Sequence, residues 1–323
     1  MKNIWKELKK PIFILAPLDD VTDTVFRQIV GDLAPPDLYF TEFTSVDGMC
    51  SELGHEPVTR KLQFTEKERP LIAQIWGNDP EKFFKAAQMV KEMGFDGIDI
   101  NMGCPEKSVV KRGMCSGLIN NPTLAAEIIK ATKEGSSGLP VSVKTRIGMR
   151  EIQTEEWLGH LLKQDLAALT VHGRTVKEMS KVPAHWDEIG KAVKLRDKIA
   201  PQTLIIGNGD VESYADGLNK VKQYNVDGIM IGRGIFKNLW IFNKSGKKPD
   251  LSLKERLDQL LKHSRLFVET WGNNKSFAIL KKFYKIYISD FEGAAELRAK
   301  FMETKDLSEV ESLVKSSLPS RQY

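Results

Sequence analysis

The sequence lacks the features that mark several large protein classes. Its 323 residues include three cysteines, Cys50, Cys104 and Cys115, which are irregularly spaced and form no CxxC pair. Such a set favours reduced thiols in a cytoplasmic protein over zinc ligands or a disulfide framework. No apolar run approaches the roughly 20 residues that a membrane-spanning helix needs, and the charged segment 1–10 does not resemble a signal peptide. We therefore expect a soluble, cytoplasmic protein with no membrane contact and no metal site.

A GxGxxG sequence after a strand is also missing, which argues against a Rossmann dinucleotide fold. Instead, eight short apolar runs alternate with helix-like segments along the first 240 residues or so. The runs are residues 12–16, 38–41, 71–76, 97–101, 141–146, 168–172, 204–207 and 228–231. Strands buried on both faces have this composition. Eight β/α alternations predict a (β/α)8 TIM barrel of the α/β class; a doubly wound sheet, the alternative, would need fewer strands.

Every predicted strand ends in a polar or glycine-rich segment. These ends hold Pro17-Leu18, Glu42, Gln74, Asn101 with Cys104, Lys144 with Arg146, His172 with Arg174, Asn208-Gly209-Asp210, and Gly232-Arg233. Any one of them has an ordinary structural explanation, such as a core histidine or a solvated lysine. TIM barrels, however, carry their chemistry at the C-terminal ends of the strands. Eight such ends together predict one active site at the barrel mouth.

The last two strand ends predict a phosphate site. Gly207–Asp210 follows the seventh strand and Gly232–Gly234 the eighth, the two loops that form the common phosphate site of TIM barrels. Glycine lets backbone N–H groups approach phosphate oxygens, and Arg233 adds a bidentate anion donor. A pair of tight turns without a ligand is the alternative.

The other polar groups suggest that the phosphorylated ligand is a flavin. Lys144 can place a cation near the pyrimidine edge of an isoalloxazine, where reduction builds up negative charge. Gln74 offers a donor and an acceptor to the ring edge, and His172 can donate to the same region or toward the phosphate. One phosphate site without a dinucleotide fingerprint favours FMN over FAD or stably bound NAD.

The C-terminal quarter differs from the barrel in charge. Residues 244–323 hold 16 lysines and arginines against 11 acidic residues, whereas residues 1–243 hold 32 of each. A linker at Ser245–Pro249 precedes four predicted helical segments, residues 251–270, 275–289, 293–303 and 307–315. We therefore predict a barrel domain over residues 1–243 and a small helical domain over residues 244–323. The basic excess fits a polyanion partner; a solvated helical surface is the alternative.

The second helical segment carries two predicted faces. On a helical wheel its aromatic and leucine residues share one face, which is more typical of core than of a base-stacking platform. That face comprises Phe277, Leu280, Phe283, Tyr284 and Tyr287. Lys281, Lys282 and Lys285 form a separate cationic stripe, which we interpret as a phosphate-contacting surface.

Taken together, these motifs resemble the tRNA-dihydrouridine synthase family, whose members reduce uridine in tRNA. The matching stretches occur in family order and span the whole predicted barrel. They are Ala16–Asp23, Thr41–Phe43, Ala73–Gly77, Asn101–Pro105, Val143–Gly148, Val171–Thr175, Gly207–Asp210 and Ile231–Gly234. The segment from Leu280 to Arg298 resembles the helical tRNA-binding domain of the family with lower specificity.

The resemblance implies a role for each matched residue. Cys104 would donate a proton to the uracil, and Asn101 would lie beside the uracil or the flavin. Arg146 and Arg174 would lie on the RNA side, with Lys281, Lys282 and Lys285 on the second domain. The flavin would be held by the remaining residues. These are Pro17, Leu18, Asp19, Gln74, Lys144, His172, Asn208, Gly209, Asp210, Gly232 and Arg233.

The reaction implied by the resemblance is a two-step reduction by a monomeric enzyme. NADPH, or NADH, would reduce FMN and leave; hydride from the flavin would then reach ring carbon 6 of uridine while Cys104 protonates ring carbon 5. A free thiol has a pKa near 8.5, so Cys104 is expected to be mostly protonated at neutral pH. Two departures from the family pattern are the acidic pair Asp19-Asp20 and Cys115, which we interpret as a packing residue.

Two other functions remain open on the sequence alone. An FMN barrel oxidoreductase acting on a small molecule, similar to dihydroorotate dehydrogenase, explains the phosphate site and Lys144 but leaves the basic C-terminal helices unexplained. A non-catalytic RNA-binding protein on a former enzyme barrel is the third reading, and the set of Cys104, Lys144 and His172 argues against it.

Overall fold

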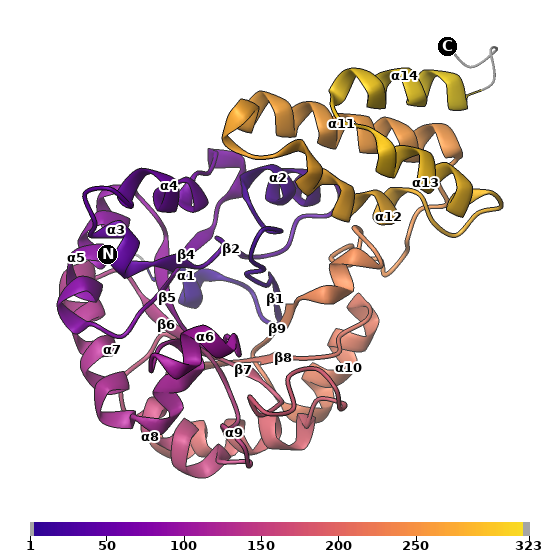
Figure 1. Ribbon diagram of the computed structural model, residues 1–323. Coiled ribbons are helices and arrows are strands. Elements are labelled where there is room, and N and C mark those ends of the chain that lie inside the picture. Colours follow the sequence, from indigo (N-terminus) through magenta and orange to yellow (C-terminus); the bar gives the residue numbers. More distant parts are fainter. Residues whose placement is uncertain (1–2, 319–323) are drawn as a thin grey trace. The chain divides into compact units, whose positions relative to one another are not determined.

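The computed structural model describes residues 3–318, and its larger part is a nearly closed parallel barrel. The strands pair in the order β1-β9-β8-β7-β6-β5-β4-β2. The bridge between Ile14 and Leu38 returns β2 to β1, and the Leu15 N–H donates to the Leu38 carbonyl at 3.2 Å. Figure 1 shows the ring of strands inside an outer ring that includes α5, α7, α8, α9 and α10. The predicted TIM-barrel fold is confirmed.

The strands occur at the apolar runs of the sequence. They are β1 (Ile12–Leu15), β2 (Tyr39–Phe40), β3 (Thr44–Ser45), β4 (Leu71–Trp76), β5 (Gly97–Met102), β6 (Val141–Arg146), β7 (Ala168–His172), β8 (Leu204–Asn208) and β9 (Gly228–Ile231). The short strand β3 was not predicted; it extends the edge of β4, where Thr44 pairs with Ile75. Eight of the nine strands therefore correspond to predicted runs.

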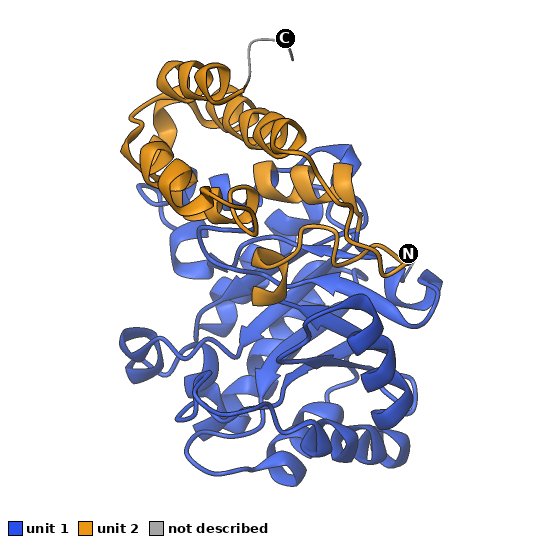
Figure 2. Cartoon of the chain, turned by 90° about the vertical axis from the view of Figure 1, so that its right-hand side faces the viewer, with its two compact units in different colours: residues 1–24, 36–232 blue, residues 25–35, 233–323 orange. Residues whose placement is uncertain are grey.

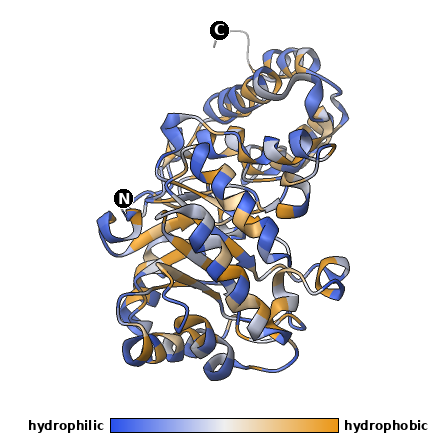
Figure 3. Cartoon of the chain, turned by 90° about the vertical axis from the view of Figure 1, so that its left-hand side faces the viewer, coloured by the Kyte–Doolittle hydropathy of each residue, from blue (hydrophilic) through white to orange (hydrophobic). Residues whose placement is uncertain are grey.

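Burial explains why these strands form. Every residue of β1, β5, β8 and β9 is buried, and Figure 3 shows the strands mostly in the hydrophobic colour. One cluster of the core contains alternate residues of several strands, including Ile12, Ile14, Ile206 and Met230. Alternation places such residues on the same face of the sheet. Trp5 of α1 (Ile4–Glu7) belongs to this cluster.

Capping residues fix the starts of the barrel helices. In α5 (Pro80–Glu92) Asp79 caps the N-terminus, and in α7 (Pro122–Ser136) Asn121 does so, each directly before a proline. Proline at the first helical position loses no hydrogen bond. Within residues 3–318, this part of the chain has ten further helical elements. They are α3 (Val46–Met49), α4 (His55–Thr59), η1 (Arg60–Leu62), η2 (Glu66–Glu68), α6 (Lys107–Lys111), η3 (Cys115–Asn120), the π-helical turn η4 (Thr154–Leu158), α8 (Gly159–Leu162), α9 (Trp186–Ile199) and α10 (Tyr214–Tyr224).

The chain divides into two compact units, shown in different colours in Figure 2. The first, residues 1–24 and 36–232, is the barrel; the second comprises residues 25–35 and 233–323. The second unit thus takes most of α2 (Thr24–Leu33) from the N-terminal part of the chain. The predicted division at residue 243 divides the sequence once, whereas the units divide it three times.

The second unit is helical and has an aromatic core. Its elements are η5 (Arg233–Phe236), α11 (Leu253–Trp271), η6 (Gly272–Asn274), η7 (Phe277–Phe283), α12 (Tyr284–Tyr287), α13 (Ala294–Glu303) and α14 (Leu307–Ser317), with α2. The ring of Phe26 stacks on Phe283 with centroids 5.0 Å apart and lies 6.4 Å from that of Phe236. Four helical segments were predicted, and the second is mostly a 3-10 helix. Across residues 3–318, no helix is long and apolar enough to span a membrane.

Candidate active site

The barrel brings most predicted site residues to the C-terminal ends of its strands. Strand register makes them neighbours around the barrel: Asn101 pairs with Lys144, Arg146 with His172, and His172 with Asn208. Pro17 and Leu18 follow β1, and Gly232 follows β9. An added Cβ at Gly232 would lie 3.8 Å from the Ala16 Cβ and 3.9 Å from Leu18. These two strand ends are therefore adjacent, as the sequence predicted for one shared site.

A chain of buried amides supports the Cys104 loop. The Asn101 Oδ1 atom accepts hydrogen bonds from the N–H groups of Gly103 and Cys104, both at 3.0 Å. Asn101 Nδ2 donates to Gln74 Oε1 at 3.0 Å, and Gln74 Nε2 donates to Asp99 at 2.7 Å. Asp99 is fully buried, and burial raises its pKa to about 6. Gln74 and Asn101 thus form a support that ends on Asp99, a residue that the sequence analysis missed.

The thiol of Cys104 is not an ordinary one. Its hydrogen bond with Cys115, opposed by burial, lowers the pKa of Cys104 to about 7, while the pKa of the buried Cys115 is raised well above its usual value. The Ser116 hydroxyl donates to the Cys104 carbonyl at 2.7 Å, which holds this segment against the Cys104 loop. With a pKa of about 7, Cys104 is about half protonated at neutral pH, less than expected of a free thiol. Cys115 is buried, as expected of a packing residue, and is also the hydrogen-bond partner of Cys104.

Lys144 is a half-buried cation without a hydrogen bond or ion pair to the described residues. Burial lowers its pKa to about 8, and the nearby Arg146 adds to this effect, while Asp99 and Cys104 oppose it. An ammonium group with three unused donors is costly in a protein interior unless an anion or acceptor reaches it. This environment is suited to a ligand oxygen at the mouth of the barrel.

Acidic residues gather beside β1 and β2. Carboxylate oxygens of Asp19, Asp20 and Glu42 lie within 4.8 Å of one another, a group that could hold a metal ion. Lys61 donates to Asp19. Burial disfavours the charge on Lys61, but Asp19, Glu42 and Asp20 outweigh it and raise the pKa of the lysine. Lys61 therefore offsets part of the extra negative charge that the sequence showed at Asp19-Asp20.

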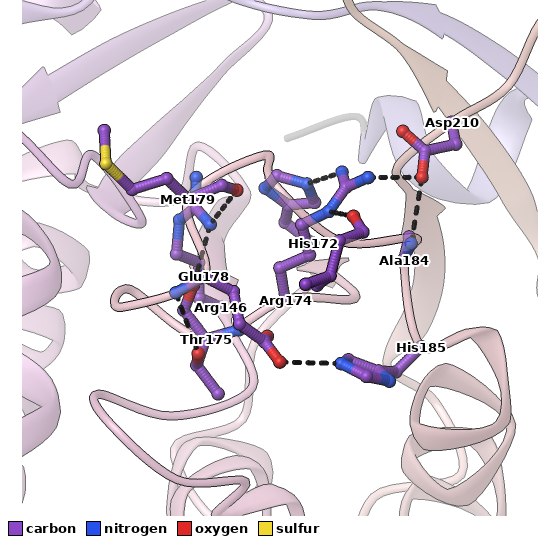
Figure 4. Close-up of polar contacts among 10 residues, drawn as sticks. Arg146, His172, Arg174, Thr175, Glu178, Met179, Ala184, His185 and Asp210 are labelled. Atoms are coloured by element: carbon purple, nitrogen blue, oxygen red, sulfur yellow. Dashed lines mark hydrogen bonds and ion pairs between the residues drawn. The ribbon is translucent and has the colours of Figure 1, made fainter.

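The ends of β7 and β8 form a second polar cluster, shown in Figure 4. The Arg174 guanidinium contacts His172 Nε2 at 3.1 Å and pairs with Asp210. Its Nε donates to the Val182 carbonyl at 2.6 Å. Two predicted cofactor residues, His172 and Asp210, are thus joined through a residue that we had placed on the RNA side. Arg174 is buried, so its assignment to RNA stays a prediction.

Arg146 is also buried and donates hydrogen bonds to carbonyl groups of the barrel unit. Its Nε donates to the Gly103 carbonyl at 2.9 Å, and its Nη1 donates to Thr175 at 3.1 Å and Met179 at 2.9 Å. Arg146 thereby joins the Cys104 loop to the loop after β7, as Figure 4 shows for Thr175 and Met179. Its predicted contact with the substrate is not tested by this arrangement.

The predicted phosphate end contains a glycine in a backbone conformation that other residues rarely adopt. Gly209 has φ +130°, and a Cβ there would lie 2.7 Å from the Ala184 Cβ, so any other residue would be strained and crowded. Asn208 donates to the Met230 carbonyl at 2.8 Å, which joins the ends of β8 and β9. Gly232 is the last residue of the barrel unit, and Arg233 begins the longer segment of the second unit.

The three lysines of the predicted cationic stripe differ in their surroundings. Lys281 donates to the Met302 carbonyl at 2.6 Å, whereas Lys282 and Lys285 are exposed. The face predicted as core is largely buried, with Leu280, Phe283, Tyr284 and Tyr287 at 3% exposure or less. That part of the helical-wheel interpretation is confirmed, although Phe277 is only half-buried.

The fold defines a TIM-barrel protein, and the polar groups at the C-terminal ends of its strands are arranged as in enzymes of this fold. Among solved structures, morphinone reductase has the same fold, with a TM-score of 0.53 and 13% identity over 75% of this chain and 87% of that one. The family model described as Dihydrouridine synthase (Dus) matches residues 14–322. The chain belongs to the dihydrouridine synthase family of oxidoreductases.

Two curated relatives are similar over almost their whole length. A probable tRNA-dihydrouridine synthase 2 of Bacillus subtilis (strain 168) is 49% identical over 97% of this chain and 96% of its own. A probable tRNA-dihydrouridine synthase of Staphylococcus aureus (strain MRSA252) is 48% identical over 97% and 95%. The resemblance read from the motifs is thereby confirmed.

Proposed function

We propose that this protein reduces specific uridines of tRNA to 5,6-dihydrouridine with FMN as its bound cofactor and NADPH, or NADH, as the reductant. The observation that carries the proposal is the placement of Cys104 beside Lys144 at the mouth of a barrel of this family. Cys104 opposes the lowering of the Lys144 pKa, so the two groups lie within electrostatic range of each other. The names of the relatives supply tRNA as the substrate class.

The residues present fit a flavin phosphate. The half-buried Lys144 ammonium has no hydrogen-bond acceptor among the described residues, so a flavin oxygen would supply one. The backbone at Gly209 and the space beside Gly232 would admit the phosphate, since an added Cβ at Gly232 makes only ordinary contacts. FMN would supply the hydride that reaches ring carbon 6 of the uracil. Pro17, Leu18 and Asp19 would line it, with Gln74, His172, Asn208, Asp210 and Arg233 as further contacts.

Cys104 would supply the proton to ring carbon 5. Its loop is held by Asn101, which stands on Gln74 and Asp99, so the thiol has a fixed position rather than that of a mobile loop residue. General acid catalysis is most effective when the pKa of the acid lies near the working pH, and the pKa of Cys104 meets that condition. The thiolate left after the transfer is stabilised by the hydrogen bond from Cys115.

The second unit would bind the tRNA backbone. Residues 1–243 have no net formal charge, whereas residues 244–323 carry the whole excess of +5. Lysines that neutralise phosphates release counterions, which makes binding strongly dependent on salt. Lys282 and Lys285 are the exposed members of the predicted stripe, and Lys281 is partly engaged by Met302.

Cys104→Ala tests the proposal by separating the two halves of the reaction. We expect flavin reduction by NADPH to continue near its normal rate, and reduction of uridine in tRNA to fall by about 10²–10⁴-fold, because only the second half uses the proton. Rapid-mixing absorbance follows the first half, and mass spectrometry of digested tRNA the second. Cys50→Ala is the matched control, since Cys50 is a second partly exposed thiol. Equal losses in both halves would assign Cys104 to flavin binding instead.

A further inference from the structure

The contact between Arg174 and His172 determines where the histidine carries its proton. We propose that Arg174 is a positioning residue that holds His172 as a neutral imidazole protonated on Nδ1. His172 is the last residue of β7 and Arg174 lies just beyond it, and both are at the centre of Figure 4. Only the suggestion that this N–H serves the flavin depends on the proposed function; the proton's position follows from the contacts themselves.

Donor chemistry decides the tautomer. A guanidinium carries five N–H donors, has no acceptor, and does not lose its proton in proteins. Arg174 Nη1 lies 3.1 Å from His172 Nε2. For this contact to be a hydrogen bond, Nε2 must accept, so it has no proton. The remaining ring nitrogen, Nδ1, then carries the single proton of a neutral imidazole.

Arg174 cannot easily turn away from the histidine. Its side chain is 3% exposed, its Nε donates to the Val182 carbonyl, and its Nη2 pairs with Asp210. Asp210 is itself held by the Ala184 N–H at 2.9 Å. Two separate partners on two loops, Val182 and Asp210, thus fix the plane of the guanidinium, which leaves Nη1 aimed at Nε2.

The charges around His172 also oppose a second proton on the ring. Arg146 is its register partner on β6, and Arg174 lies two residues beyond it, after the end of β7. Asp210, after β8, is the nearby carboxylate and is paired with Arg174. On the side of β8, an added Cβ at Gly209 would lie 3.2 Å from His172 Cδ2 and 3.6 Å from Nε2. The Cδ2–Nε2 edge therefore faces this loop, and Nδ1 lies on the other side of the ring.

A second histidine in the same loop provides an internal contrast. His185 Nε2 lies 2.9 Å from Glu178 Oε1, and an ionised carboxylate only accepts hydrogen bonds. His185 Nε2 must therefore carry a proton, the opposite of His172. Two histidines that follow the same strand are thus held in different protonation patterns by one arginine and one glutamate.

The consequence is a donor that does not change with pH. A neutral His172 fixed in this tautomer carries one N–H donor and no positive charge. If the site holds FMN as proposed, Lys144 would stabilise the negative charge that builds up on reduction. His172 would add no charge and would help to orient the ligand through its hydrogen bond.

The experiment is 15N NMR of the full chain with labelled histidine. There are five histidines, and the signals of His172 and His185 are assigned by their loss in His172→Gln and His185→Gln. We expect His172 to show a protonated Nδ1 and a bare Nε2 from about pH 5.5 to 8.5, across the range in which a free histidine titrates. His185 should show a protonated Nε2. A protonated Nε2 at His172, or titration of His172 with a pKa near 6.5, would overturn the proposal.

Two variants separate the cause from general packing. Arg174→Gln replaces a pure donor by an amide that can also accept, so His172 should show both tautomers or begin to titrate. Glu178→Gln is the matched control and should change the His185 signals alone. An unchanged His172 spectrum in a folded Arg174→Gln protein would also reject the proposal; if that variant does not fold, the wild-type spectrum decides. Because the spectra are recorded without flavin, a failure to bind FMN would refute the proposed function and leave this result intact.

Discussion

Removing the thiol of Cys115 should change the pH dependence of the reaction. Cys115 is the main cause of the lowered pKa of Cys104, so in Cys115→Ala that pKa should return toward the ordinary value for a thiol, near 8.5. Only the protonated Cys104 can act as an acid. With a pKa of about 7, roughly 3% of wild-type Cys104 is protonated at pH 8.5, against about half in the variant. We therefore expect the variant to be roughly 15-fold faster at pH 8.5 and little changed at pH 6.

Two measurements test this reasoning. Pre-reduced enzyme mixed with unmodified tRNA at a series of pH values gives the midpoint at which the second half-reaction is lost. Alkylation of Cys104 by iodoacetamide, followed by peptide mass spectrometry, reports the thiolate and should become several-fold slower in the variant at pH 7. Cys115→Ser is the control, because its hydroxyl can still donate to Cys104 and should keep the wild-type midpoint. Identical midpoints in wild type and Cys115→Ala would show that Cys115 does not set the acidity of Cys104.

Three further changes have predictable effects. Lys144→Met should raise the free energy of unfolding of the flavin-free protein in urea at pH 7 by about 1–2 kcal/mol, because the lowered pKa of Lys144 marks a charge that costs stability in the folded state. The same change should weaken FMN binding at least tenfold in a fluorescence titration. A loss of both stability and FMN binding would contradict this prediction. Asp227→Asn should lower the free energy of unfolding by about 3 kcal/mol at pH 7, since Asp227 pairs with the buried Arg196 at 2.6 Å. The pKa of Asp227 is lowered in the folded state despite burial. Its contribution to the free energy of unfolding is therefore fully present above the unfolded pKa, near 3.9, and should disappear as the pH falls through the folded pKa. A difference in stability between wild type and Asp227→Asn that persists in acid would count against an ionic role. Changing Lys282 and Lys285 to Ala should weaken tRNA binding and lower the salt slope by up to about one unit per phosphate contact, with FMN content unchanged; an unaltered slope would leave the stripe as a solvated face.

The barrel could be predicted from sequence because its strands are buried on both faces. A run such as Gly228–Ile231 has no polar side chain and clear ends, and β9 occupies that range. Strand β3 was missed because two residues, Thr44 and Ser45, carry no periodicity. The wheel drawn over residues 275–289 assumed one α-helix, whereas residues 277–283 form a 3-10 helix. The buried positions were still found, because large apolar side chains were recognised by type.

For the site, the sequence predicted which residues stand at strand ends but not their partners. Arg146 and Arg174 were expected to face RNA; both are buried because the loop after β7 folds back and offers carbonyls to them. Cys115 lies outside the family motif that contains Cys104, and its contact with Cys104 depends on the fold of the segment that leads into η3. Asp99 did carry a signal, since a carboxylate within the apolar run Gly97–Ile100 needs partners to be buried.

The composition of the second unit has a consequence for biosynthesis. Phe26 leaves the ribosome early, whereas Phe236 and Phe283, the rings it stacks on, follow about 200 residues later or more. Contacts of such long range are slow to form and leave apolar surface exposed meanwhile. A chain ended at residue 243 would keep α2 and lose Phe283, Lys262 and the other C-terminal partners of this helix. Expression of the barrel by itself would therefore benefit from removing the apolar face of α2 as well, and a nascent chain must protect that face until the last helices arrive.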